Sequence, residues 1–120
     1  MTKPMAVILL LAGGLVAADK DNYQRSKECA TQAEKLARQE GLSIVRNHYS
    51  QKYNGCFALL VWINNDNDLI SIYSLFDAFE HSVLAEEDHN YSKNSHKCTV
   101  GKQSYPCAQV EQYVENYLTD

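Results

Sequence analysis

The most regular pattern of hydrophobic and polar positions in the chain has the spacing of a helix. Residues 21–40 are rich in Ala, Glu, Lys, Gln and Arg and contain no Gly or Pro. Within them, four small or apolar residues recur at i, i+4, i+7 and i+8: Cys29, Ala33, Leu36 and Ala37. This spacing predicts a helix with one narrow apolar face, and Gly41 follows it as a C-cap.

A second helical pattern closes the chain. Its apolar positions again fall at i, i+3, i+4, i+7 and i+8: Val110, Tyr113, Val114, Tyr117 and Leu118. The intervening residues are polar, so the pattern predicts an amphipathic helix that begins just after Pro106-Cys107.

Between these helices the pattern is that of strands. Residues 44–49 form a short segment of mixed apolar and polar side chains. Residues 56–63 form an unbroken apolar run, and residues 69–76 are rich in β-branched and aromatic side chains. Turn-forming residues separate these runs, at Asn54-Gly55 and at 64–68. We therefore expect an antiparallel meander, with residues 77–85 as either a fourth strand or a short helix.

The remaining segment carries weaker signals. Residues 86–95 are polar and predict a loop, and residues 97–105 predict a small hairpin with Gly101-Lys102 at its turn. The fold class expected is α+β: a small antiparallel meander of three to five strands packed with an N-terminal and a C-terminal helix.

The register at Asn54-Gly55 decides which side chains share a face of the sheet. A two-residue turn would place Tyr49 beside Leu60, and a bulged three-residue loop would place it beside Leu59. We favour the bulged loop, because it groups six mostly apolar residues under the helices: Val45, Tyr49, Phe57, Leu59, Val61 and Ile63. The opposite face would then carry Arg46, His48, Leu60 and Trp62, and we regard it as a candidate partner-binding face.

The first eighteen residues have the features of a secretory signal. Lys3 is the only charge before Asp19, an apolar run follows it, and Val16-Ala17-Ala18 supplies small residues at a cleavage site. The apolar run of about fourteen residues is shorter than the roughly 20 that a membrane-spanning helix needs. We expect residues 1–18 to be removed, leaving 19–120 as a single domain in the periplasm or outside the cell, with no membrane association after cleavage.

All four cysteines lie in this expected mature domain, which in an oxidising compartment predicts two disulfides. The gaps between them hold 26, 41 and 8 residues, and these gaps do not fit the paired spacing of a zinc site. Three pairings are open from sequence alone. We favour Cys29–Cys56 and Cys98–Cys107, because consecutive cysteines close segments that we expect to pack together.

Charge and candidate chemistry narrow the function classes only slightly. After loss of Lys3, ten Lys and Arg stand against fifteen Asp and Glu, a net charge of −5 that disfavours nucleic-acid binding. The four histidines form no metal-binding motif, and no serine lies in a nucleophile motif. The run Asn64-x-Asp66-x-Asp68 begins like a calcium loop but lacks its glycine and its glutamate, which favours a hairpin turn. We expect no cofactor and no bound metal.

Several structural motifs resemble those of a diffuse group of small exported bacterial proteins of unknown function. They are Cys29 in a helix, His48-Tyr49, Cys56-Phe57, Ser74-Leu75-Phe76-Asp77-Ala78, Lys97-Cys98-Thr99-Val100 and Cys107. The resemblance implies the α+β layout and a bacterial periplasm, and it implies no catalytic residue.

The absence of a catalytic motif makes a binding protein the leading hypothesis. We expect an exported module, inhibitor-like or immunity-like, with a protein partner; a homodimer seam is a further use for its exposed face. The alternatives are a small enzyme or metal-binding protein that uses His89, His96 and the neighbouring carboxylates, and a structural envelope protein without a discrete site.

Overall fold

The computed structural model describes the chain from residue 3 to residue 120, and its side chains from residue 21 onward. Residues 1 and 2 of the expected signal segment, and the side chains of the rest of it, lie outside the described residues. None of the helices in the described part of the chain combines the length and the apolarity that crossing a membrane requires.

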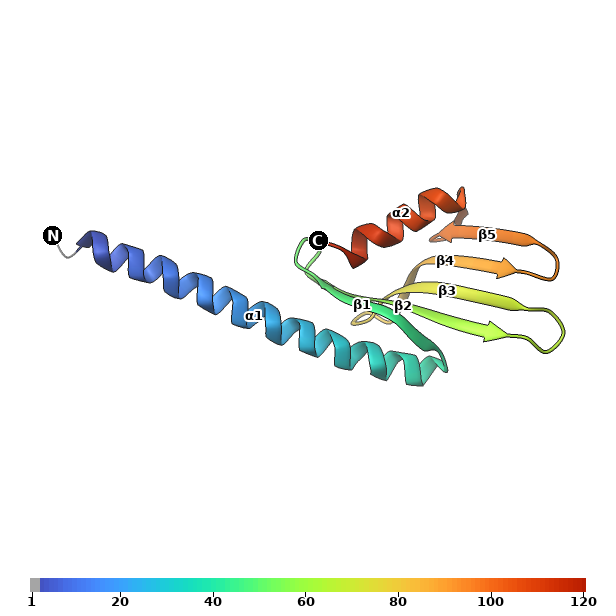
Figure 1. Ribbon diagram of the computed structural model, residues 1–120, viewed down its shortest axis with the longest axis horizontal. Helices are drawn as coiled ribbons and strands as arrows, with labels where there is room; N and C mark the ends of the chain where they lie inside the picture. Colours follow the sequence, from blue (N-terminus) through green and yellow to red (C-terminus); the bar gives the residue numbers. More distant parts are fainter. Residues whose placement is uncertain (1–2) are drawn as a thin grey trace.

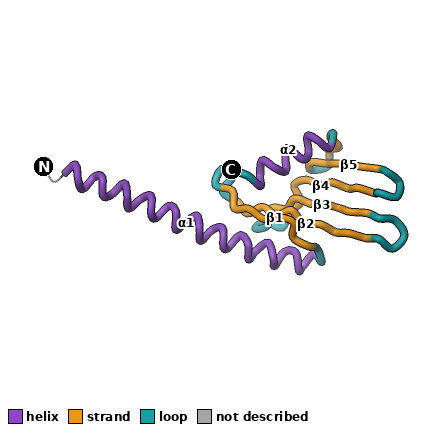
Figure 2. The backbone as a smooth tube through the Cα atoms, viewed as in Figure 1, coloured by secondary structure: helices purple, strands orange, loops and turns teal. Residues whose placement is uncertain are grey.

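The fold is α+β, as the sequence predicts, with six strands rather than three to five. Helix α1 (Lys3–Glu40) leads into an antiparallel sheet, and helix α2 (Cys107–Leu118) follows the sheet. The strands lie in chain order: β1 (Ser43–Ser50), β2 (Gly55–Asn64), β3 (Ile70–Asp77), β4 (Ser82–Asn90), β5 (Ser95–Val100) and β6 (Gln103–Ser104). Figures 1 and 2 show this meander, with the first half of α1 extending away from it.

Helix α1 ends where the sequence places its C-cap. Gly41 has a φ of 69°, in the left-handed region that glycine adopts without steric cost. Leu42 N–H then donates to the carbonyl of Ala37 at 2.9 Å, which satisfies one of the last carbonyls of the helix. Leu42 itself packs against the core beneath α1, so the chain turns directly from the helix into β1.

The two helices cover opposite faces of the sheet, whereas the sequence-based interpretation placed both on one face. Successive residues of a strand point to opposite faces, and β2 divides accordingly. Cys56, Ala58 and Leu60 are buried with the apolar face of α1. Phe57 and Leu59 pack instead with Val110 and Leu118 of α2. The unbroken apolar run of β2 is explained by this burial on both sides.

The register between β1 and β2 differs from both registers considered above. Tyr49 pairs with Cys56 and Ser50 with Gly55, so the turn is longer than either predicted loop. Asn54 takes a φ of 49°, and its side-chain oxygen accepts hydrogen bonds from Arg25 of α1 at 2.8 Å and from the Tyr49 hydroxyl at 2.6 Å. The turn is thus bonded to α1, a contact that the turn preference of Asn54-Gly55 does not predict.

The segment 86–95, predicted as a loop, is mostly strand. Strand β4 continues to Asn90, and β5 begins at Ser95. Both edges of β4 are hydrogen-bonded, to β3 and to β5. Its polar side chains are accommodated because this end of the sheet lies largely outside the two helical covers. Composition alone therefore mispredicted this segment, and the expected fourth strand at 77–85 begins only at Ser82.

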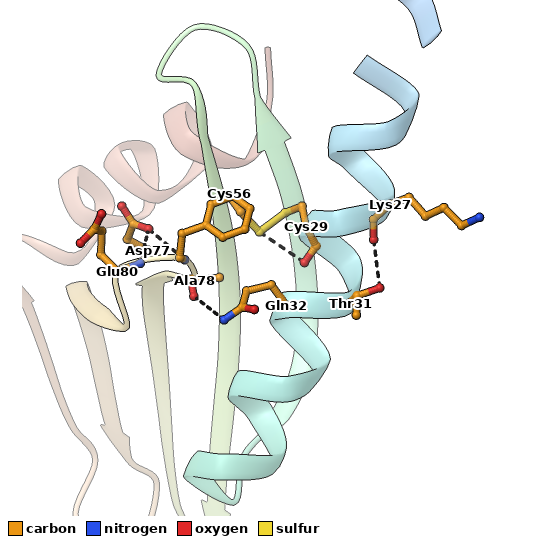
Figure 3. The surroundings of a disulfide bond; sticks show 9 residues. Lys27, Cys29, Thr31, Gln32, Cys56, Asp77, Ala78 and Glu80 are labelled. Atoms are coloured by element: carbon orange, nitrogen blue, oxygen red, sulfur yellow. Dashed lines mark hydrogen bonds between the residues drawn. A yellow bond between two sulfur atoms is a disulfide. The ribbon is translucent and has the colours of Figure 1, made fainter. Parts of the chain in front are cut away.

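Both disulfides have the favoured pairing, Cys29–Cys56 and Cys98–Cys107. Each one joins a helix to a strand beneath it, and the two lie on opposite faces of the sheet. Figure 3 shows the first link between α1 and β2, where Gln32 also donates to the carbonyl of Ala78 at 3.1 Å. Two disulfides indicate a non-reducing environment.

Candidate functional site

The four residues proposed as a partner-binding face do not share one face. The observed register places Arg46 and His48 opposite Leu59 and Phe57, on the side that α2 covers. Leu60 and Trp62 point to the side of α1. Leu60 is fully buried there, while Trp62 lies farther along β2 and keeps 38% of its surface exposed. The grouping failed because it depended on the mispredicted register.

Arg46 and His48 instead hold the end of α2 and the residues after it. Arg46 forms a salt bridge with Glu115 of α2 and donates to the carbonyl of Leu118 at 3.4 Å. His48 pairs with the carboxylate of Asp120. These contacts fix the C-terminal end of α2 against β1, and with it the position of the helix over the sheet.

Asp120 is the most strongly bonded carboxylate on this face. Its side chain accepts hydrogen bonds from His48, from the Lys52 backbone N–H at 2.9 Å and from the Ser50 hydroxyl at 3.0 Å. Hydrogen bonds that favour the charged form lower a carboxyl pKa. The bond from His48 is the largest cause, and together these bonds lower the pKa of Asp120 to about 2.

A cleft of about 310 Å³ lies between α2 and the sheet. Strands β2, β3 and β4 form its floor and α2 forms its wall. Six of its lining residues are apolar or aromatic: Leu59, Tyr73, Leu75, Ala85, Val110 and Val114. This volume is at the lower limit for small-molecule pockets, and it suits one long side chain or a short segment of a partner.

The remaining lining residues of the cleft are all acidic: Glu86, Glu87, Glu111 and Glu115. Among the described side chains, Arg46 is the permanent cation bonded to this group, through its salt bridge with Glu115. Glu87 is bonded to His96 instead. Glu86 pairs with Ser74 of β3, on the face of β4 opposite to Ala85 and Glu87, so its side chain points away from the cleft. The three carboxylates of Glu87, Glu111 and Glu115 against one permanent cation leave an excess of negative charge beside the apolar floor. Such a cleft complements a basic group carried on an aliphatic stem.

Sequence reasoning missed this cleft because its parts come from four separated segments. Glu86 and Glu87 lay in the predicted loop, and Glu111 and Glu115 were interpreted as the solvent face of the terminal helix. Alternation from Ala85 through Glu87 to His89 is the one signal that could have revealed a strand there. Placing α2 over that strand still requires the tertiary structure.

Tyrosines of α2 lie beside the cleft and fasten the helix to the sheet. Tyr117 packs against the rings of Phe57 and Tyr53, with ring centroids 4.7 and 4.5 Å away. Tyr113 is bonded to Tyr117 through their hydroxyl groups at 3.4 Å. Burial first, and then this bond, raise the pKa of Tyr113 to about 12. Both tyrosines pack against the core beneath α2, in keeping with their place on the apolar face of the predicted helix.

His89 and His96, the candidates for the enzyme or metal alternative, are brought together. They are cross-strand neighbours whose rings stack with centroids 4.5 Å apart. His96 Nε2 lies 2.6 Å from a Glu87 carboxylate oxygen and 3.7 Å from Cys98 Sγ. Ligand-type atoms of His96, Cys98 and Cys107 fall within 4.8 Å of one another, but both sulfur atoms are in a disulfide and offer no thiolate to a metal.

The other two histidines lie apart from this cluster. His48 is at the end of α2, and His81 lies in the turn before β4, 3.0 Å from the Gln32 amide nitrogen of α1. The Asn64–Asp68 segment is a hairpin turn, as predicted, with Asp66 N–H bonded to the Asn64 side chain at 2.9 Å.

The described residues thus present one acidic, apolar cleft on the α2 face and one cluster of titratable groups beside the Cys98–Cys107 disulfide. Comparison of the chain with models of protein families, with curated proteins and with solved structures finds no match.

Proposed function

We propose that this protein is exported and binds a protein partner, in the manner of a small inhibitor or immunity protein. The partner inserts a basic segment into the acidic cleft between α2 and the sheet. The observation that carries the proposal is the combination of an apolar floor with the carboxylates of Glu87, Glu111 and Glu115 beside it.

Export is supported by the signal-like N-terminus and by the disulfides. The segment 1–18 has the charge, apolar run and small residues of a secretory signal. Among the described side chains, the buried apolar residues begin at Cys29. Cleavage after Ala18 would therefore leave the described core intact. The periplasm or the outside of a bacterial cell supplies the oxidising conditions in which the two disulfides persist.

A protein partner is favoured over a small ligand by the form of the cleft. It lies open between a helix and a sheet, and Glu111 on its wall is exposed. A lysine or arginine side chain can lay its methylene groups on the apolar floor and place its charge among the carboxylates. A rigid surface held by two disulfides loses little conformational entropy when it binds.

The chemistry of the cleft can be tested with a peptide of alternating lysine and leucine that carries a fluorescent label. We expect the full chain to bind this peptide and a glutamate–leucine peptide to remain unbound. Glu111→Lys should weaken binding about tenfold, because like charge then faces the basic segment. Glu28→Lys is the matched control, since it reverses an exposed charge on α1, away from the cleft.

The function itself is tested by capture of proteins from the native cell envelope. One protein should be retained by the wild type and by Glu28→Lys, and lost with Glu111→Lys. Retention of the same protein by both variants, or capture of none, would contradict the proposal.

A further inference from the structure

We propose that Cys98–Cys107 is a thiol–disulfide exchange site, in which His96 stabilises the thiolate released from Cys98. This inference is independent of the proposed binding function. It rests on the arrangement of two sulfur atoms, one imidazole and one carboxylate at the start of α2.

The two sulfur atoms differ in their access to solvent. Cys98 lies in β5 and is 2% exposed, whereas Cys107, the first residue of α2, is partly exposed. An external thiolate therefore reaches the sulfur of Cys107 more easily. Attack there makes Cys98 the leaving group, so the surroundings of Cys98 influence the rate.

Those surroundings favour a negative charge on the Cys98 sulfur. His96 Nε2 lies 3.7 Å from it, and the same nitrogen is bonded to Glu87 at 2.6 Å. An imidazole this close to a sulfur can give it a hydrogen bond or a proton as it leaves as a thiolate, and the bond to Glu87 holds the ring in this position. His89 of β4 also contacts His96, by stacking on its ring.

Cys107 has a second source of stabilisation once it is reduced. It begins α2, where unpaired backbone N–H groups carry partial positive charge. Pro106, the N-cap residue, supplies no side-chain hydrogen bond to this terminus. A thiolate at this position gains from the free N–H groups, which lowers the cost of the reduced form.

The exchange proceeds in two balanced steps with a small-molecule thiol as reductant. Its thiolate attacks Cys107 Sγ, a mixed disulfide forms, and the Cys98–Cys107 bond breaks with its electron pair on Cys98 Sγ. That thiolate is held by the His96 imidazolium or takes its proton. A second thiolate then attacks the reductant's sulfur in the mixed disulfide and releases Cys107 as a thiolate. Two external thiols are oxidised to one disulfide, and the protein disulfide is reduced to two thiols.

Cys29–Cys56 provides an internal reference in the same molecule. Both of its cysteines are fully buried between α1 and β2. It should resist attack until the fold opens.

The test is timed reduction of the full chain with dithiothreitol, quenched by alkylation and mapped by mass spectrometry. We expect Cys98–Cys107 to be reduced at least about tenfold faster than Cys29–Cys56. His96→Gln should slow this reduction about fivefold at about pH 6, with the rate expressed per reductant thiolate. The difference should become smaller as the pH is raised towards about 8.5, because a neutral imidazole gives the departing thiolate less stabilisation. Glu87→Gln should act in the same direction with a smaller effect.

His89→Gln is the matched control, because it removes the neighbouring stacked ring and leaves the contact with sulfur. Its rate should stay within about twofold of the wild type. The protection of Cys29–Cys56 in each variant reports whether the fold is intact. Equal reduction rates of the two disulfides would overturn the proposal. It would also fail if His96→Gln kept the wild-type pH profile, since access alone would then explain the selectivity.

Discussion

Cys29–Cys56 and Cys98–Cys107 make the same kind of connection, a helix joined to a strand beneath it, in opposite surroundings. The first lies fully buried in the core between α1 and the sheet. The second lies at the margin of the α2 face, beside His96 and Glu87. We therefore assign the α1 face a role in stability, and call it the structural half of the molecule. The α2 face contains the cleft and the reactive groups.

The largest expected effect follows from removing the buried disulfide. Replacing Cys29 and Cys56 together by alanine should lower the free energy of unfolding by about 3.5 kcal/mol. The reason is that the unfolded chain regains the conformational entropy of the loop that the disulfide closes, whose ends are 27 residues apart. The same change at Cys98 and Cys107, separated by 9 residues, should cost about 2.5 kcal/mol. Urea denaturation of the full chain measures both. A greater loss of unfolding free energy on replacing Cys98 and Cys107 would contradict the assignment of the α1 face as the structural half.

Two residues of β2 test how far along this strand α1 buries the sheet. Leu60→Ala should cost about 3 kcal/mol of unfolding free energy, since it leaves a cavity under α1. Trp62→Ala, two residues farther on the same face, should cost less than about 1 kcal/mol because its side chain is partly exposed. The urea denaturation midpoints of the two variants measure these losses. Similar losses at the two positions would show that the cover reaches beyond Leu60.

The smallest effect concerns the end of α2 and its dependence on pH. The folded pKa of Asp120, about 2, lies below the ordinary value of 3.8. The charged carboxylate therefore stabilises the fold near neutral pH, and this contribution is lost as the pH falls from about 4 to about 2. Asp120→Asn should cost about 1 kcal/mol at pH 7, less than the pKa difference alone implies, because water reaches the pair.

Urea midpoints between pH 2 and pH 7 measure this contribution. The wild type should lose stability across the acid range, and Asp120→Asn should flatten part of that slope. Asp66→Asn, in the exposed hairpin turn after β2, is the control and should keep the wild-type slope. If stability changed with pH in Asp120→Asn as steeply as in the wild type, the role of Asp120 in holding the end of α2 against β1 would be contradicted.

The helices, the central strands and both disulfides were predictable because each depends on a local pattern or on pairing of neighbours. The spacing of Cys29 with Ala33 and Leu36 defines the face that packs on Cys56. The register at Asn54 was not predictable, because Arg25 from α1 bonds to that side chain. Gly55 also proved to be a strand residue, where an added Cβ would meet the Phe57 ring at 2.9 Å.

The candidate site was not predictable for a related physical reason. Its acidic residues belong to β4 and α2, and polar composition in β4 resembles a loop until pairing with β3 and β5 is known. The two helices on opposite faces follow from the burial of β2 on both sides, which the unbroken apolar run did indicate. Assigning one helix to each face required the register.

The central claim, that recognition belongs to the α2 face, is tested most directly by photo-crosslinking in cells that export the full chain. A photoreactive residue replaces Glu111 beside the cleft in one variant and Glu28 on α1 in another. We expect one discrete crosslinked protein from position 111 and none from position 28. A crosslinked partner from position 28 alone, or no product from either position, would contradict it.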